Sequence, residues 1–175
     1  QFPLSKKEIN YLEFEDTLID DSTIVATHPT TNILSRVYVQ VHSHGVVLAD
    51  NVQVMLLISN IASEEAPVLP PAFDNNVREK LAINNSNWKT LGIVKLDNLR
   101  VGYPKIVTFE LNSNIFSSEI TLNRNNSYYL LALVHHTDDP FRNTELNTDS
   151  LSKNERKAAL KKIRVIPFEG TFPSE

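Results

Sequence analysis

YYLLALVHHTDDP, residues 128–140, is an apolar run that begins with two aromatic residues and ends at a carboxylate pair followed by proline. A second run, RVYVQVHSHG at residues 36–45, alternates apolar and polar side chains with a period of two. That period places the apolar side chains of a strand on one face of a sheet. Two such strands, far apart in the sequence, can close two sheets over one core, so these runs predict a β-sandwich.

Other short segments are also typical of strands, because they are rich in β-branched and apolar residues. They are residues 22–27, 51–58, 91–96, 107–111 and 163–166. The second half of 51–58 is apolar on both faces, as in a central strand. Residues 60–73 form a long connection with three prolines, which disfavours a ladder strand.

Two segments predict short helices. Phe73, Val77 and Leu81 are spaced four apart, and Asp74 is a candidate cap for one or two turns. Ser152-Lys153-Asn154-Glu155 has the pattern of a capping box, which predicts a helix at about 152–162.

The sequence therefore predicts an all-β fold, an immunoglobulin-like antiparallel β-sandwich of about seven to eight strands with one or two short helical insertions. We expect an acidic arm at 1–21, the sandwich at 22–168 with its helical insert at about 152–162, and a tail at 169–175. The expected core consists of Val37, Val39, Val41, Trp88, Val107, Phe109 and residues 129–134.

Composition narrows the class of protein. The chain has 175 residues, enough for one domain with a sizeable core, and its hydrophobic content of 41% excludes wholesale disorder. The net charge of −4 argues neither for nucleic acid nor for an anionic membrane as the main partner. There is no cysteine, and no apolar run is long enough to span a bilayer. Because the chain begins at Gln1, we expect a processed or excised piece of a longer protein.

The order of several short motifs resembles CARDB-like domains, a family of bacterial immunoglobulin-like modules. The motifs are residues 36–45, Ala49-Asp50-Asn51-Val52-Gln53-Val54, the loop Pro67 to Pro71, Trp88 followed by Leu91-Gly92, Val107-Thr108-Phe109, and residues 129–135 before Asp138-Asp139-Pro140. The resemblance covers about 22–142, and the closing strand extends it to 166. The arm at 1–21 and the insert at 152–162 depart from the pattern.

The resemblance implies a non-catalytic adhesion or accessory domain of a larger bacterial protein. It transfers no catalytic residue and favours the cell surface or a secreted location. The partners implied are neighbouring domains of the same polypeptide or another protein. The oligomeric state stays open.

Four of the histidines are candidate metal ligands. His42 and His44 are two apart on a strand and can share a face. His135, His136, Asp138 and Asp139 could approach them if the strands pair or their ends meet. We favour a solvent-facing position for His42 and His44, because no third ligand at a characteristic spacing is present.

Asp138 and Asp139 could hold calcium together with Asn143 and Glu145. An aspartate-proline turn explains the same carboxylates without an ion. We therefore predict no metal or cofactor site.

The segment from Lys153 to Arg164 carries six Lys or Arg and one Glu. As a helix it could dock on an acidic partner or nucleic acid within an intracellular assembly, which is the alternative function. We expect instead a solvated face or pairing with the acidic arm, and no nucleic-acid partner.

No enzyme signature is present in the sequence. There is no Gly-x-Ser-x-Gly, no phosphate-binding glycine loop and no His-Glu-x-x-His. A metal-dependent hydrolase built on the histidines would need an acid/base constellation that the sequence does not offer. We therefore expect a non-catalytic interaction, adhesion or spacer module, whose binding residues lie in loops at one end of the sandwich, including 60–73 and 136–150.

Overall fold

The computed structural model describes residues 23–26, 35–60, 63–111 and 127–167. The strands and helices in these ranges are β1 (Thr23–Ala26), β2 (Ser35–Val41), β3 (Val52–Ser59), α2 (Phe73–Glu79), β4 (Trp88–Leu96), β5 (Lys105–Leu111), β6 (Ser127–His135), α3 (Thr148–Asn154) and β7 (Ala158–Pro167). Every strand segment predicted from the sequence is present. The predicted arm at 1–21 and tail at 169–175 lie outside the described residues.

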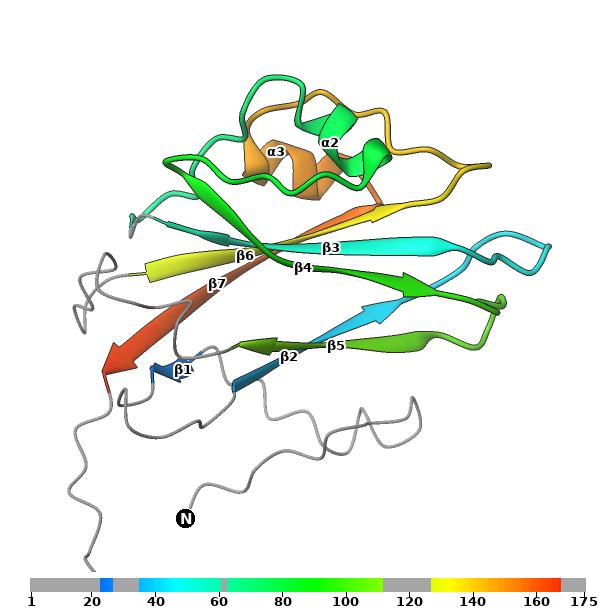
Figure 1. Cartoon of the computed structure of the whole chain (residues 1–175), viewed down its shortest axis with the longest axis horizontal. Coiled ribbons are helices and arrows are strands. Elements are labelled where there is room, and N and C mark those ends of the chain that lie inside the picture. Colours follow the sequence, from blue (N-terminus) through cyan, green and yellow to red (C-terminus); the bar gives the residue numbers. More distant parts are fainter. Residues whose placement is uncertain (1–22, 27–34, 61–62, 112–126, 168–175) are drawn as a thin grey trace, which may run out of the picture.

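The strands form two sheets that face each other (Figure 1). The larger sheet has the order β1-β7-β6-β3-β4, and the smaller consists of β2 and β5. β1 runs parallel to β7, whereas every other pair of described strands is antiparallel. The predicted all-β sandwich is therefore confirmed at the level of two packed sheets with few helices.

One hydrophobic core lies between the two sheets. It contains Val52, Val54, Leu56 and Ile58 of β3, Tyr128, Leu130 and Ala132 of β6, and Val107, Phe109 and Leu111 of β5, among others. From β2, Val41 is buried, and Val37 and Val39 pack against this core. The inward-facing valines predicted from the period-two pattern are thus confirmed.

A second core lies on the other face of the larger sheet, beneath the two helices (Figure 1). It contains Met55 and Leu57 of β3, Tyr129, Leu131 and Leu133 of β6, and Trp88, Leu69, Phe73, Val77, Ile83, Phe141, Leu151 and Ala158. Every residue of β3 is buried as a result, as expected for a central strand with apolar faces on both sides. Trp88 is a core residue, as predicted, but it belongs to this second core.

The helix predicted near Phe73 is present as α2, but its predicted cap is wrong. The helix follows Ala72, which adopts a left-handed conformation with φ of 59° and provides no side-chain cap. Asp74 lies in the first turn, where its carboxylate forms an ion pair with Arg78 at 2.9 Å. Leu81 lies beyond the helix and is exposed.

The helix predicted at about 152–162 is wrong. α3 ends at Asn154, and residues from Ala158 onward form β7. The Oδ1 of Asn147 caps α3 by accepting the Ser150 N–H at 2.9 Å, which places the cap upstream of the predicted capping box. β7 pairs with β6 over its whole first half, so sheet pairing overrides the local preference for helix.

The loops predicted to bind a partner, 60–73 and 136–150, do not lie together at one end. One follows β3 and the other follows β6, and these strands are antiparallel, so the loops leave from opposite ends of the sheet. Both then cross the same face and meet over the second core (Figure 1). The Leu69 N–H donates to the Leu146 carbonyl at 2.8 Å, so the loops and helices form one continuous cover.

Candidate binding site

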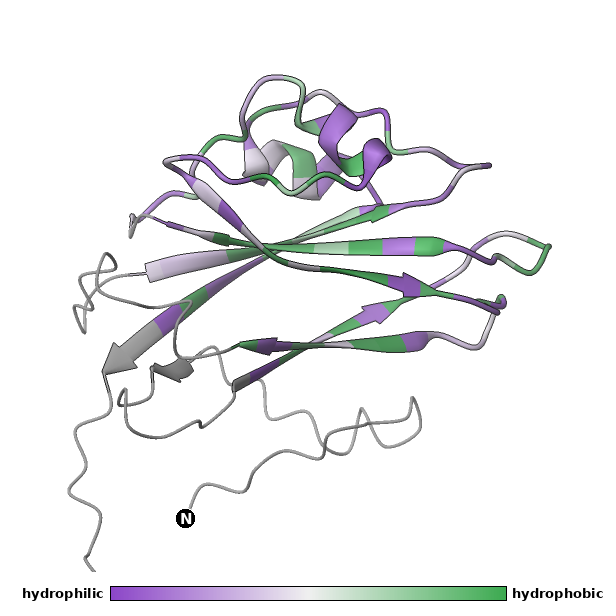
Figure 2. Ribbon diagram, viewed as in Figure 1, coloured by the Kyte–Doolittle hydropathy of each residue, from purple (hydrophilic) through white to green (hydrophobic). Residues whose placement is uncertain are grey.

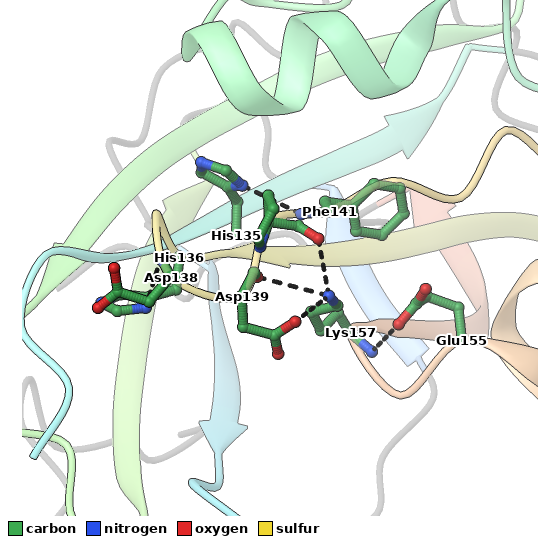
Figure 3. Close-up of polar contacts among 8 residues, drawn as sticks. His135, His136, Asp138, Asp139, Phe141, Glu155 and Lys157 are labelled. Atoms are coloured by element: carbon green, nitrogen blue, oxygen red, sulfur yellow. Dashed lines mark hydrogen bonds and ion pairs between the residues drawn. The ribbon is translucent and has the colours of Figure 1, made fainter. Parts of the chain in front are cut away.

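His135 is buried at the end of β6 and anchors the turn that follows it (Figure 3). Its Nδ1 accepts the Phe141 N–H at 3.2 Å. Burial lowers the pKa of His135, and the nearby His136 and Lys157 act in the same direction. The ring is thus held neutral as a structural acceptor within the fold.

His136 links the same turn to the loop between β2 and β3. Its Nδ1 accepts the Asp138 N–H at 3.3 Å, so the proton belongs on Nε2, which donates to the Asp50 carbonyl at 2.8 Å. Both nitrogens of His136 are therefore used within the fold. His42 and His44 are exposed, as predicted.

Of the candidate calcium ligands, Asp139, Asn143 and Glu145 have hydrogen-bond partners in the chain, and Asp138 is exposed. Asp139 accepts from the Lys157 ammonium at 2.8 Å, and the same ammonium donates to the Pro140 carbonyl at 2.9 Å (Figure 3). Asn143 Oδ1 accepts the Glu145 N–H at 2.9 Å. Among the described residues, no group of three or more His, Asp or Glu side chains gathers as metal ligands would.

The basic segment does not form the docking helix that the alternative function requires. Its second half is strand β7, so its cations do not line one helical face. Lys157 is engaged as above, and Lys162 donates to the Glu64 carbonyl at 3.3 Å while its ammonium lies 5.9 Å from the centre of the Tyr129 ring. These contacts hold β7 and the loop after β3 together.

A different surface stands out where the loops 42–51 and 97–104 meet. Most of the large hydrophobic side chains that are exposed in the described chain lie on these two loops. They are Val46, Val47, Leu48, Val101 and Tyr103, and we call them the apolar tip. Figure 2 shows the hydrophobic end of the loop between β2 and β3 projecting beyond the sheets. Contiguous exposed apolar residues mark contact surfaces more often than single ones do.

The two loops are joined at their base by a reciprocal set of hydrogen bonds, the Asp–Asn clasp. Asp97 Oδ1 accepts the Asn51 N–H at 2.9 Å, and Asp50 Oδ1 accepts the Asn98 N–H at 2.7 Å. Asn51 and Asn98 both adopt left-handed backbone conformations, with φ of 60° and 58°, which asparagine tolerates better than most residues.

Backbone contacts reinforce the clasp. Ala49 and Leu99 exchange two N–H to carbonyl bonds of 2.9 Å, and Ser43 forms an isolated bridge with Val101. The Asn51 N–H lowers the pKa of Asp97, and the Lys95 ammonium at 3.2 Å acts in the same direction. Together these contacts hold the two loops side by side.

An open depression lies beside the apolar tip. It has a volume of about 380 Å³ and is lined by Asn98, Arg100, Tyr103, Pro104 and Lys105. The Lys105 ammonium also donates to the Asp97 carbonyl. Two cationic side chains and two neutral polar groups border this depression, and no carboxylate lines it, which suits an anion.

Neither the clasp nor the apolar tip was singled out from the sequence. The signal for the clasp is the dipeptide Asp-Asn at 50–51 and at 97–98, although the same dipeptide at 74–75 lies in α2. Asp and Asn favour turns and accept backbone N–H groups, but which loop each would bond is set by the sheet pairing. The signal for the tip is the run Val46-Val47-Leu48, which directly follows Gly45 in the loop after β2.

Comparisons with known protein families, with curated proteins and with solved structures find no match. The resemblance to CARDB-like domains therefore depends on the sequence motifs alone. In the part of the chain that the structure describes, no helix has the length and apolar character needed to cross a membrane.

Proposed function

We propose that this chain is a non-catalytic, immunoglobulin-like interaction module of a larger bacterial multidomain protein. The strand pairing supports the immunoglobulin-like part. β7, β6, β3 and β4 correspond in order to strands G, F, C and C′ of a variable-type domain, and β2 with β5 corresponds to B with E. The insertions that carry α2 and α3 are then additions to the loops C–C′ and F–G.

The resemblance to CARDB-like domains fits this assignment. Its two best-defined motifs, residues 36–45 and 49–54, lie on β2, β3 and the loop between them. That loop is the B–C loop of the proposed topology, and it carries most of the apolar tip. The recognition loops of variable domains occupy the same end of the sandwich.

The single observation that carries the proposal is the apolar tip on its Asp–Asn clasp. Val46 is 98% exposed and Val47 is 73% exposed, although both are aliphatic. Such side chains are unfavourable in water and become favourable when a partner covers them. An adhesion or docking role at this end therefore fits better than a role as a passive spacer.

Mapping with a small apolar probe tests this proposal. We expect tert-butanol, titrated into labelled protein, to shift the amide NMR signals of residues 44–48 and 100–103 most strongly. The paired substitution Val46→Ser with Val47→Ser should abolish those shifts, whereas Val68→Ser, at an exposed valine on the cover, should leave them. Shifts that gather on the cover, or that show no preferred location, would refute the proposal.

A further inference from the structure

The shape of the apolar tip favours insertion into a partner. Val46 and Val47, in the loop between β2 and β3, are 98% and 73% exposed, and Tyr103 is 72% exposed on the neighbouring loop. Aliphatic side chains that protrude in this way can enter a soft apolar phase without a matching groove. Tyrosine, with an apolar ring and a polar hydroxyl, suits the boundary between that phase and water.

The outer part of the tip carries a cation and no carboxylate, although the net charge of the whole chain is negative. Residues 42–48 and 99–104 contain no Asp or Glu, and Arg100 with Lys105 lines the adjacent depression. The carboxylates of Asp50 and Asp97 lie in the clasp at the base of the loops and accept backbone N–H groups. Asp50 and Asp97 are themselves exposed, as are Asp138 and Asp139 in the turn linked to Asp50 through His136, so the carboxylates of this end lie at the base of the loops and beside them.

The clasp also reduces the cost of binding. Both loops are already joined by the four backbone N–H groups of Ala49, Leu99, Asn51 and Asn98. A surface that is ordered before binding loses less conformational entropy when it meets its partner. The tip is therefore prepared for contact without a folding step.

We propose that the apolar tip docks on a lipid bilayer that carries anionic headgroups. The aliphatic side chains would enter the boundary between headgroups and acyl chains, and Arg100 and Lys105 would face lipid phosphates. This inference rests on the proposed interaction function, because it names the partner of the same surface. A specific protein interface usually buries roughly 800 Å² on each partner, more than a tip of five side chains offers alone.

The absence of cysteine allows a direct test of insertion. A single Val46→Cys variant, labelled with the polarity-sensitive dye NBD, should brighten and shift to the blue with vesicles of 70% phosphatidylcholine and 30% phosphatidylserine. The same label at Val68→Cys, on the cover, should not change. Equal responses at both positions, or none at position 46, would overturn the inference.

Vesicle flotation of the full chain measures how strongly each variant binds to the vesicles. Val46→Asp with Val47→Asp should weaken binding to the anionic vesicles by at least about tenfold. Arg100→Gln with Lys105→Gln should weaken it by roughly tenfold or more and remove the preference over pure phosphatidylcholine. The matched control Lys153→Gln with Arg156→Gln, at two exposed cations of the basic segment, should bind like the wild type.

Other outcomes would show that the apolar tip binds something other than a lipid bilayer. A dimer in sedimentation equilibrium that Val46→Asp dissociates, without vesicle binding, would assign the tip to a second copy of this chain and overturn the lipid proposal. Absence of vesicle binding at low ionic strength would also overturn it. If tert-butanol still maps to residues 44–48 in that case, the interaction function survives and the lipid assignment alone fails. Far-ultraviolet circular dichroism confirms that each variant is folded.

Discussion

Replacing Trp88 tests how the helical cover is fastened to the sheet. The indole is fully buried at the start of β4, and its Nε1–H donates to the carbonyls of Pro67 at 3.2 Å and Val68 at 3.1 Å. The hydroxyl of Thr148, the first residue of α3, donates to the same Pro67 carbonyl at 3.2 Å. One buried oxygen therefore joins β4, the loop after β3 and α3.

The expected magnitudes follow from these contacts. Trp88→Phe removes a hydrogen-bond donor, worth about 1 kcal/mol net, and leaves a small cavity that costs about 1 kcal/mol more. Thr148→Val removes the other donor, for about 1 kcal/mol. In the double variant the buried Pro67 carbonyl loses both partners. The loss of stability should then exceed the sum of the two single losses by about 1 kcal/mol.

Urea unfolding followed by far-ultraviolet circular dichroism measures each free energy, provided that the slope with urea stays constant. Tryptophan fluorescence cannot follow the variants that lack Trp88, because it is the one tryptophan of the sequence. Thr144→Val, at an exposed threonine in the same connection, is the matched control and should change stability by less than about 0.5 kcal/mol. Additivity of the two losses within about 0.3 kcal/mol would refute the shared-acceptor arrangement.

Three further measurements probe other parts of the fold. Gly92→Val should destabilise the protein by about 1–3 kcal/mol, because a Cβ at Gly92 would lie 3.2 Å from the Phe109 ring, and Phe109→Leu in the same chain should recover part of that loss. Burial lowers the pKa of His135, so the unfolded chain takes up a proton that the folded chain does not as the pH falls below about 6.5. The free energy of unfolding should therefore fall between pH 7 and pH 5, and His135→Gln should flatten that dependence; an unchanged profile would contradict the assignment. Asn147→Ala should cost about 1 kcal/mol in thermal or urea unfolding, since it removes the cap of α3, and a neutral result would argue against the cap.

The strands were predictable because burial and periodicity agree in them. Residues 52–59 are apolar on both faces, and the structure places cores on both sides of β3. The alternation of Val37, Val39 and Val41 likewise gave the inner face of β2. In such segments the local pattern and the tertiary environment select the same conformation.

The segment after α3 was not predictable in the same way. Its alanines and lysines favour helix locally, and the preceding Ser-x-x-Glu pattern strengthened that interpretation. β6 nevertheless provides an open edge beside it, and Ala158, Leu160 and Ile163 have partners there. Whether an edge is free depends on the pairing of strands far away in the sequence, which a local pattern does not contain.

The apolar tip was not predicted from the sequence, and the reason is related. The net charge of −4 gave no argument for an anionic membrane, but it averages over groups that lie at different ends of the molecule. The sheet pairing brings residues 42–48 and 99–104 together, and neither segment contains a carboxylate. Partner recognition depends on the local field at the contact surface, so the folded arrangement can reverse a conclusion drawn from the whole chain.

The helical cover also explains why the binding surface would lie at the end of the sandwich. In a two-layer sandwich the outer face of the larger sheet is available to a partner. Here Phe73, Phe141 and Leu151, which belong to the helical cover, pack on that face and bury it. That apolar area is already used to stabilise the fold. The exposed aliphatic residues that remain together are those of the loops 42–51 and 97–104. A cover that closes one face therefore leaves the clasped loops as the place where new apolar contacts can still form.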